Sequence, residues 1–307
     1  MPTDAINRVD AINRVPTEVR PARSEDREAV LAFCVHTWDW GDYIEYVWDE
    51  WLHDPQGQMF VATVDGQPVG VAHIRMLSST EAWLEGMRID PAYRQQGLAT
   101  AINDVMLAEA MRRGATVARL ITESTNTSAM RAIGHSFMRQ VGAFVPFKAM
   151  PLATLPTRLQ GLETPQLATS ADVDELIQYL NASNVFPAVG GLYYSGYTAR
   201  SITQELLAAK VAAKEVYLLR RWDRLDGLAI AEPQQGGHAH QLFIGYIDGT
   251  TEAISLIAYA LRRIVLEMEL ESVSANAPDL MMVRDAFVGA EYEWNGTVFY
   301  TFERELA

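Results

Sequence analysis

Residues 84–111 read LEGMRIDPAYRQQGLATAINDVMLAEAM, and this stretch decides the fold. The pattern predicts a strand, a short turn and an amphipathic helix that opens on Arg94-x-x-Gly97-x-Ala99. Unpaired backbone N–H groups at the start of a helix bind anions. Arg94 adds a positive charge there, Gly97 admits a close approach of the backbone, and Ala99 keeps the first turn clear. We therefore expect a pyrophosphate group to bind at residues 94–100.

The same stretch excludes two other phosphate-binding motifs. A P-loop ends in Gly-Lys-Ser or Gly-Lys-Thr, and neither tripeptide is present. A dinucleotide-binding fingerprint needs three glycines after the first strand of a βαβ unit, whereas here one glycine follows several predicted strands. Three fixed positions also recur by chance, so an ordinary surface helix with a Gly-containing turn remains the alternative.

The surrounding pattern predicts an α/β (α+β) fold. Alternating apolar residues favour strands, and apolar residues at a period of 3.6 favour helices. Asp65-Gly66 between two apolar runs indicates a β-hairpin. In the first half we expect strands at 19–22, 59–64, 68–74, 82–89, 117–122 and 142–147, and helices from residue 24, at 98–113 and at 128–137.

This order of elements, with three motifs, resembles the GCN5-related N-acetyltransferases (GNAT) over residues 18–150. Arg94–Thr100 resembles motif A, the stretch from Thr122 to Asn126 resembles motif B, and Val141-Gly142-Ala143-Phe144 resembles the closing strand. The resemblance implies acetyl-CoA as the co-substrate, with its pantetheine arm aligned by the strand before motif A. The residues that it implies for cofactor binding are Met87, Arg88, Ile89, Arg94, Gln95, Gln96, Gly97, Leu98, Ala99, Thr100 and Asn126.

The second half repeats the order, which predicts two tandem GNAT folds, each a mixed, mostly antiparallel twisted sheet flanked by helices. At its motif A position, residues 248–253 read DGTTEA, with acids and no arginine. Negative charges at a helix start repel a pyrophosphate, so we expect this half to bind CoA poorly or not at all. The expected organisation is a flexible tail at 1–16, a catalytic acetyl-CoA-binding domain at 17–150, a linker at 151–164 and a degenerate GNAT-like domain at 165–307.

The resemblance implies that an amine attacks the thioester carbonyl after a base has removed a proton from the ammonium. Because alternate residues of a strand share a face, the strand before motif A should place five residues on one face: Glu81, Trp83, Glu85, Met87 and Ile89. Glu85 lies nearest the pantetheine end and is our candidate base; a structural ion pair with Arg88 or Arg75 is the alternative. The N–H of Met87 is expected to face the oxyanion, a contribution of roughly 3 kcal/mol.

A general acid is harder to place. The family usually offers a tyrosine in the helix after motif B, where this sequence has Ile133-Gly134-His135-Ser136. Histidine is the side chain that gives and takes protons near neutral pH, so His135 is the candidate acid. A surface histidine at a helix end is the alternative, with water or the C-terminal half protonating the thiolate.

The acceptor is expected to bind the segment from Trp38 to Pro55, which holds four of the seven tryptophans. Aromatic rings beside carboxylates suit a cationic amine, and we expect Trp40, Asp42 and Tyr43 to bind it. Core packing of the same helix is the alternative. With residues 84–89, this segment is partly similar to histidine N-acetyltransferases, which implies a free amino acid as an acceptor class.

Composition limits the partners and the compartment. A formal charge of −14 without a dense block of Lys and Arg argues against nucleic acid, and no window approaches the roughly 20 apolar residues of a membrane span. The single cysteine, Cys34, favours a reducing cytoplasm. No metal is expected, because His238 and His240 have no acidic or cysteine ligand clustered beside them. A homodimer stays open.

The sequence thus predicts an acetyl-CoA-dependent N-acetyltransferase acting on a small-molecule amine. Two alternatives stay open. The first is a non-catalytic sensor that binds acetyl-CoA or an amine. The second is a protein acetyltransferase acting on N-termini or lysines, which an open peptide groove would favour.

Overall fold

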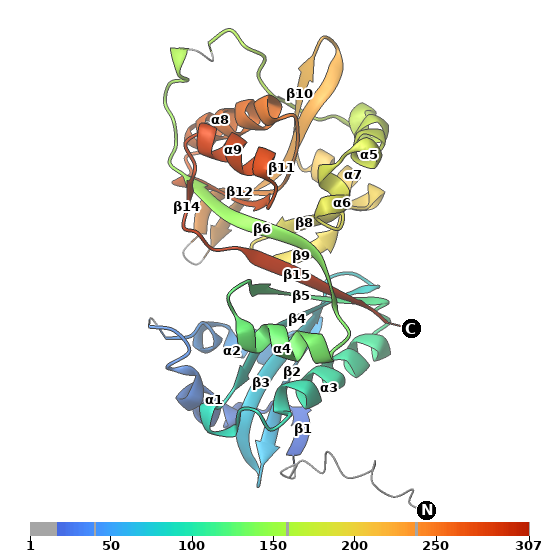
Figure 1. The fold of residues 1–307 in the computed structure, drawn as a ribbon, viewed down its shortest axis with the longest axis vertical. Coiled ribbons are helices and arrows are strands. Elements are labelled where there is room, and N and C mark those ends of the chain that lie inside the picture. Colours follow the sequence, from blue (N-terminus) through green and yellow to red (C-terminus); the bar gives the residue numbers. More distant parts are fainter. Residues whose placement is uncertain (1–16, 40, 158–159, 237–238, 307) are drawn as a thin grey trace, which may run out of the picture. The chain divides into compact units, whose positions relative to one another are not determined.

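The computed structural model describes residues 17–39, 41–157, 160–236 and 239–306 (Figure 1). The chain divides into two compact units. Unit 1 holds the described residues up to Leu120, Arg131–Met138 and the residues from Glu303 on; unit 2 holds Ile121–Met130 and Arg139–Phe302. The domain boundaries at residues 150 and 165 stay predictions, and the expected tail at 1–16 lies outside the described residues.

Unit 1 is built on a mostly antiparallel sheet in the order β1-β2-β3-β4-β5, in which β4 and β5 run parallel. The β2–β3 hairpin turns at Asp65 and Gly66, whose φ angles of 49° and 79° suit a type I′ turn, as predicted. The strands are β1 (Thr17–Pro21), β2 (Gly57–Val64), β3 (Gln67–Met76), β4 (Glu81–Ile89) and β5 (Val117–Glu123). The helices are α1 (Arg27–Cys34), α2 (Ile44–Leu52), α3 (Leu98–Arg112) and α4 (Thr127–His135), and α4 and β5 contribute residues to both units.

Helices cover both faces of this sheet. Because successive strand residues point to opposite faces, Val61 packs with α1 and α2 around Val30 and Trp48, whereas Ala62 packs with α3 around Ile102. Each fully buried aliphatic side chain contributes roughly 1.5–3 kcal/mol relative to exposure. The two apolar clusters therefore hold β3 and β4 firmly between helix layers. Side chains on these two strands are attached to a rigid backbone.

A β-bulge interrupts β4. On β3, Val71 pairs with Arg88 and His73 pairs with Glu85, so β4 carries one more residue than β3 between these pairs. Gly86 in the bulge has a φ of 70°, a conformation that favours glycine. The extra residue reverses which face the following side chains meet.

The predicted strict alternation along β4 is therefore wrong beyond the bulge. Met87 and Ile89 pack in the α3 cluster with Leu84. Glu85 and Arg88 instead make their contacts with residues on the α1 and α2 side. The sequence period alone could not reveal this bulge, because one extra residue changes which side chains share a face without interrupting the strand pattern.

The last residues of the chain complete unit 1. Arg119 on β5 is buried, and its guanidinium donates to Glu81 and, at 2.7 Å, to Glu303 of the C-terminal strand. Leu306 joins the α3 cluster, and its N–H donates to the carbonyl of Thr116 at 2.8 Å. Residues that the sequence placed with the second domain thus belong to the first compact unit.

Unit 2 has a sheet in the order β15-β6-β13-β12-β11-β10-β7, with β14 on β6 and with β12 and β13 parallel. Its strands are β6 (Arg139–Ala149), β7 (Gln166–Leu167), β8 (Leu192–Ser195), β9 (Thr198–Ser201), β10 (Val216–Arg221), β11 (Arg224–Gly236), β12 (Ala239–Gly249), β13 (Ser272–Pro278), β14 (Glu293–Trp294) and β15 (Phe299–Glu305). Its helices are α5 (Val173–Ala182), α6 (Val185–Ala188), α7 (Gln204–Ala212), α8 (Thr251–Glu267) and α9 (Met281–Gly289).

Helices also cover both faces of this second sheet. α8 and α9 pack together on one face, around Ile257 and Phe287 (Figure 1). On the other face α5 and α7 pack with Tyr193 of β8 and Tyr246 of β12. The β8–β9 hairpin and α6 are elements that the sequence did not predict. Their segment is short and rich in glycine and tyrosine, without a clear period.

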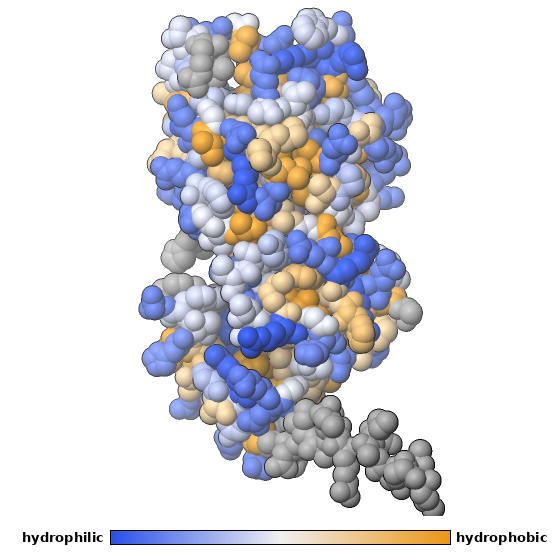
Figure 2. Space-filling view, in the orientation of Figure 1, coloured by the Kyte–Doolittle hydropathy of each residue, from blue (hydrophilic) through white to orange (hydrophobic). Residues whose placement is uncertain are grey.

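On the face drawn in Figure 2, hydrophilic residues cover most of the area, and hydrophobic residues form small separate groups. Among the described residues, no helix is both long and apolar enough to cross a membrane.

Candidate active site

The loop between β4 and α3 turns through two residues of left-handed backbone. Asp90 begins it: its Oδ1 accepts the N–H of Ala92 at 2.9 Å and caps a 3₁₀ turn at Pro91–Tyr93. Gln95 and Gly97 follow with φ angles of 62° and 82°. For Gln95 this conformation costs about 1–2 kcal/mol, a strain of the kind that clusters at functional sites.

Gly97 is the N-cap of α3 and has no side chain with which to cap the helix. The first backbone bond joins the N–H of Ala101 to the carbonyl of Gly97 at 3.0 Å. Within the described chain, no acceptor pairs with the N–H groups of residues 98–100, so their partial positive charge faces outward. A Cβ at Gly97 would meet nothing within 4 Å, so the chain itself needs glycine there for its φ rather than for space.

Arg94 lies exposed beside this helix start. Its Nε donates to the carbonyl of Ile89 at 3.3 Å, which ties the guanidinium to the last residue of β4. An open cavity of about 490 Å³ adjoins it, lined by Asp90 on the loop and by Phe33 and His36 from the α1 region. The structure thus places a cation shortly before the helix start that the sequence predicted as an anion site, whereas the cavity lies toward α1 and is lined by no residue from 95 to 100.

β4 has an open edge on its β5 side. The parallel pairing holds over Glu81–Trp83 and Val117–Arg119, and the described residues of the two strands have no paired positions beyond it. An extended ligand can therefore hydrogen-bond to the backbone of residues 84–89 as an added strand. Met87, Arg88 and Ile89, which the resemblance assigned to the pantetheine arm, lie on this edge.

Glu85 is held by a buried histidine. Oε1 of Glu85 lies 3.0 Å from Nδ1 of His73, and the glutamate side chain is 21% exposed. Among the described residues, neither Arg75 nor Arg88 pairs with this carboxylate. A partly exposed carboxylate with one oxygen held by an imidazole has what a general base needs.

Arg88 lies beside two aromatic rings that stack on each other. Its guanidinium carbon lies 4.7 Å from the ring centre of Trp38 and 5.1 Å from that of Tyr43. Asp42 accepts from its Nε at 2.7 Å and from Nη2 at 3.3 Å. Burial raises the pKa of the Tyr43 hydroxyl, which therefore stays neutral near pH 7. Because Asp42 and Tyr43 already hold a cation of this chain, their role in acceptor binding stays a prediction; Trp40 lies outside the described residues.

The other predicted residues lie at α4. Oδ1 of Asn126 accepts the N–H of Ala129 at 3.0 Å and so caps this helix; Asn126 belongs to unit 2. His135 is exposed at the end of α4 in unit 1. No hydrogen bond joins His135 to Glu85 in the described chain, and the cofactor role of Asn126 and the acid role of His135 stay predictions.

Neither His73 nor Asp54 was predicted from the sequence as a functional residue. In the structure His73 lies between Asp54 and Glu85. Nε2 of His73 lies 3.5 Å from Oδ2 of Asp54. A signal existed, since His73 is the one ionisable residue in the apolar run 68–74. As for metals, no group of three or more His, Cys, Asp or Glu side chains suited to an ion occurs in the part of the chain that the structure describes.

Two comparisons bear on this site. Residues 25–135 match the model of the acetyltransferase (GNAT) family. The fold is similar to a GCN5-related N-acetyltransferase from Sphaerobacter thermophilus, with 14% identity, a TM-score of 0.60, and coverage of 94% of this chain and 96% of that one. It is also similar to a fungal multi-domain GH3 β-N-acetylglucosaminidase with a GCN5-related glucosamine N-acetyltransferase region, with 12% identity, a TM-score of 0.62, and coverage of 97% and 39%.

No curated protein matches the chain. The low identities mean that the solved structures establish the fold, whereas the family match rests on the sequence of residues 25–135. That segment contains α1, the bulged strand β4, the loop at Arg94–Gly97 and α3. The comparisons thus show a match of residues 25–135 to the GNAT family model and, for the chain, a fold shared with solved acetyltransferase structures.

Proposed function

We propose that this protein is an N-acetyltransferase that moves the acetyl group of acetyl-CoA to the amine of a small molecule. One observation carries the proposal: the open edge of β4 leads from half-buried Glu85 to the uncapped start of α3 at Gly97. An extended thioester arm can pair along this edge while its pyrophosphate meets the helix N–H groups and Arg94. The GNAT match of residues 25–135 supports the same function.

In the proposed reaction, the amine nitrogen attacks the carbonyl carbon of the thioester. A C–N bond forms, the C–S bond breaks, CoA leaves as its thiolate, and Glu85 takes the proton from the amine. The N–H of Met87 is proposed to donate to the oxyanion, a contribution of roughly 3 kcal/mol. His135 is proposed to protonate the thiolate, and its exposure leaves water as an equal candidate.

The acceptor is proposed to be a small amine that approaches Glu85 from the α1 and α2 side. Arg88 lies on that side, where its guanidinium donates to Asp42 and contacts the rings of Tyr43 and Trp38. The partial similarity to histidine N-acetyltransferases makes a free amino acid one acceptor class to test. A cytoplasmic location and a homodimer also remain predictions from the sequence.

Unit 2 is proposed to be a divergent copy that does not bind acetyl-CoA. Its parallel strands β12 and β13 and its helix α8 follow the order of β4, β5 and α3. However, Thr250 alone separates β12 from α8, and its Oγ1 accepts the N–H of Ala253 at 3.2 Å. The chain thus caps this helix itself and leaves no loop that could surround a pyrophosphate.

Calorimetric titration of the whole chain with acetyl-CoA tests the cofactor site. We expect one site per chain with a Kd of about 1 μM, near −8 kcal/mol, and loss of binding in Gly97→Glu, which adds a negative charge at the helix start. Gly289→Glu, at an open position in unit 2, is the matched control and should bind normally. Two sites would overturn the proposal for unit 2, and no binding would overturn the proposed function.

Turnover with a panel of amines tests the chemistry. Glu85→Gln should lower kcat by about 10²–10⁴-fold, the usual contribution of a general base, while the Kd for acetyl-CoA stays unchanged. Wild-type turnover limited to peptides would favour a protein acetyltransferase. Cofactor binding without turnover of any amine would favour the sensor.

A further inference from the structure

A fully buried histidine lies between two carboxylates on the α2 side of β4. His73 is 0% exposed, with Nδ1 3.0 Å from Oε1 of Glu85 and Nε2 3.5 Å from Oδ2 of Asp54. Its ring stacks on Trp51, with centroids 4.6 Å apart and planes inclined by 8°. A buried polar ring costs free energy unless it is paired, so its place between two acids needs an explanation.

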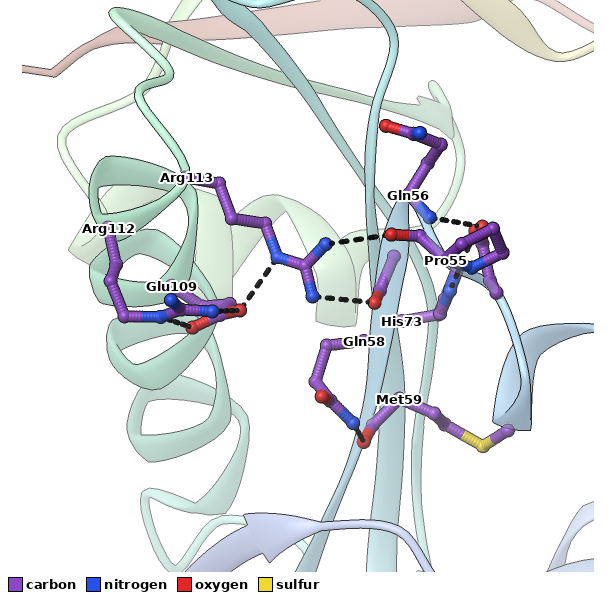
Figure 3. A network of polar contacts seen from close by, with 10 residues as sticks. Pro55, Gln56, Gln58, Met59, His73, Glu109, Arg112 and Arg113 are labelled. Carbon is purple, nitrogen blue, oxygen red and sulfur yellow. Dashed lines mark hydrogen bonds and ion pairs between the residues drawn. The ribbon is translucent and has the colours of Figure 1, made fainter.

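The chain is shaped to keep this arrangement. A Cβ at Gly57 would clash with Nε2 of His73 and with Oδ2 of Asp54. Arg113 at the end of α3 anchors the same turn, because its guanidinium donates to the carbonyl of Gly57 at 2.8 Å and reaches that of Pro55 at 3.5 Å (Figure 3). The turn and the imidazole are therefore fixed relative to each other before any ligand binds.

The carboxylate of Asp54 is itself oriented. Its Oδ1 accepts the N–H of Gln56 at 2.8 Å, and its Oδ2 lies 3.5 Å from Nε2 of His73, an atom that has no hydrogen-bond partner among the described residues. The Asp54 side chain is 13% exposed, so solvent reaches the outer end of the row. The row Asp54–His73–Glu85 thus runs from a partly exposed acid to the candidate base.

The fold alone does not require this row. In unit 2, β11 and β12 form the corresponding strand pair, with Gly227 paired to Gly249 as Gly70 is paired to Ile89. Three residues beyond Gly227 stands the apolar Ile230, whereas three residues beyond Gly70 stands His73. The same strand pair can therefore be built with an aliphatic side chain. The strand pairing does not by itself explain the imidazole of unit 1.

We propose that His73, backed by Asp54, is the positioning residue for Glu85; this inference rests on the proposed function. Nδ1–H of His73 donates to Oε1 and stops rotation of the carboxylate. Oε2 then faces the acceptor, and the described residues supply no partner for it. The ammonium N–H bond breaks, its proton goes to Oε2, and its electron pair stays on nitrogen for the attack on the thioester.

Two variants of His73 test the proposal. His73→Leu removes the donor, and His73→Asn returns an amide N–H near the position of Nδ1. We expect His73→Leu to lower kcat by about 10²-fold, the usual cost of a misplaced catalytic group, with the KM for the amine and the Kd for acetyl-CoA within threefold of wild type. His73→Asn should recover at least a tenth of wild-type kcat. His240→Leu, at an exposed imidazole in unit 2, is the matched control and should keep wild-type kcat.

Nitrogen-15 NMR of the imidazoles gives a readout that needs no turnover and covers the case in which His73→Leu fails to fold. We expect a protonated Nδ1 on His73 in the wild type and a changed Nδ1 signal in Glu85→Gln. An unprotonated Nδ1 would overturn the inference. So would a folded His73→Leu variant with wild-type kcat, or one in which KM alone rises, and in both cases the proposed function would stand. Absence of turnover by the wild type would overturn the proposed function and this inference together.

Discussion

The passage from β4 to α3 in unit 1 and the passage from β12 to α8 in unit 2 follow the same course but end differently. Each strand has a parallel neighbour, and each leads into the longest helix of its unit. Residues 90–97 separate β4 from α3, whereas Thr250 alone separates β12 from α8. The proposal that unit 2 does not bind acetyl-CoA began from the acids of residues 248–253. The short connection and the capped start of α8 also support it.

The same comparison separates the candidate base from its counterpart. In β4, Glu85 lies four residues beyond the parallel pair Glu81↔Val117. In β12, Gly245 lies four residues beyond the parallel pair Gln241↔Ser272. A Cβ at Gly245 would clash with the backbone carbonyl of Tyr194 and with the ring of Tyr193. Unit 2 thus fills with β8 the space in which unit 1 holds a carboxylate. For the divergent copy that we propose, the difference means that packing, as well as the absence of a charged residue, excludes a site at this position.

Among the substitutions that test this comparison, Gly245→Ala should have the largest effect on stability. The added methyl group meets backbone rather than the end of a flexible side chain, so β8 must shift, and we expect a loss of about 1–3 kcal/mol in the free energy of unfolding. Urea denaturation measures it. Gly289→Ala in α9 meets open space and should gain roughly 0.5–1 kcal/mol. An unchanged stability of Gly245→Ala would show that β8 does not close this space.

Matched substitutions at the two helix starts sharpen the comparison with a smaller effect. Gly97→Ala forces a side chain into a φ of 82°, at a cost of about 1–2 kcal/mol, and should weaken acetyl-CoA binding because the loop must shift. Thr250→Ala removes the cap of α8 and should cost about 1 kcal/mol without changing acetyl-CoA affinity. Thermal unfolding and calorimetry measure the two quantities. Weaker acetyl-CoA binding by Thr250→Ala would contradict the assignment of the cofactor to unit 1.

Much of the fold could be predicted because its signals are local. Asp65 and Gly66 fix a hairpin by their own backbone preferences, and Gly114 ends α3 with a φ of 96°. The helix predicted at 98–113 is observed at Leu98–Arg112, and the strand predicted at 117–122 is observed at Val117–Glu123. The loop that we propose to bind the cofactor lies in one contiguous stretch of sequence.

Contacts between distant residues could not be predicted in the same way. One partner of Arg119 is Glu303, far along the chain, and no local pattern joins them. The bulge at Gly86 changed the faces of β4 by a single residue. In the sequence, His73 is a single polar residue in an apolar strand, and only the fold shows that Asp54 lies beside it. Each of these depends on tertiary packing, which one sequence does not display.

Asp248, seven residues beyond the parallel pair, occupies in β12 the place that Arg88 has in β4. Its Oδ2 accepts from the hydroxyl of Ser183 at 2.5 Å and from that of Tyr246 at 2.7 Å. Burial nevertheless raises the pKa of this carboxyl above its ordinary value, because the desolvation of the charged form outweighs these hydrogen bonds. The acid is therefore most favourable to the fold when it is protonated.

The smallest predicted effect follows from the sign of that shift. A carboxyl whose pKa is raised by folding contributes stability that is complete below the unfolded value of about 3.9 and is lost as the pH rises through the folded value. Asp248→Asn keeps an oxygen acceptor and does not titrate. The free energy of unfolding of the wild type minus that of the variant should therefore fall between the unfolded pKa and neutral pH, as urea denaturation at several pH values would measure. A difference that grows with pH would mean that Ser183 and Tyr246 stabilise the ionised form more than burial disfavours it.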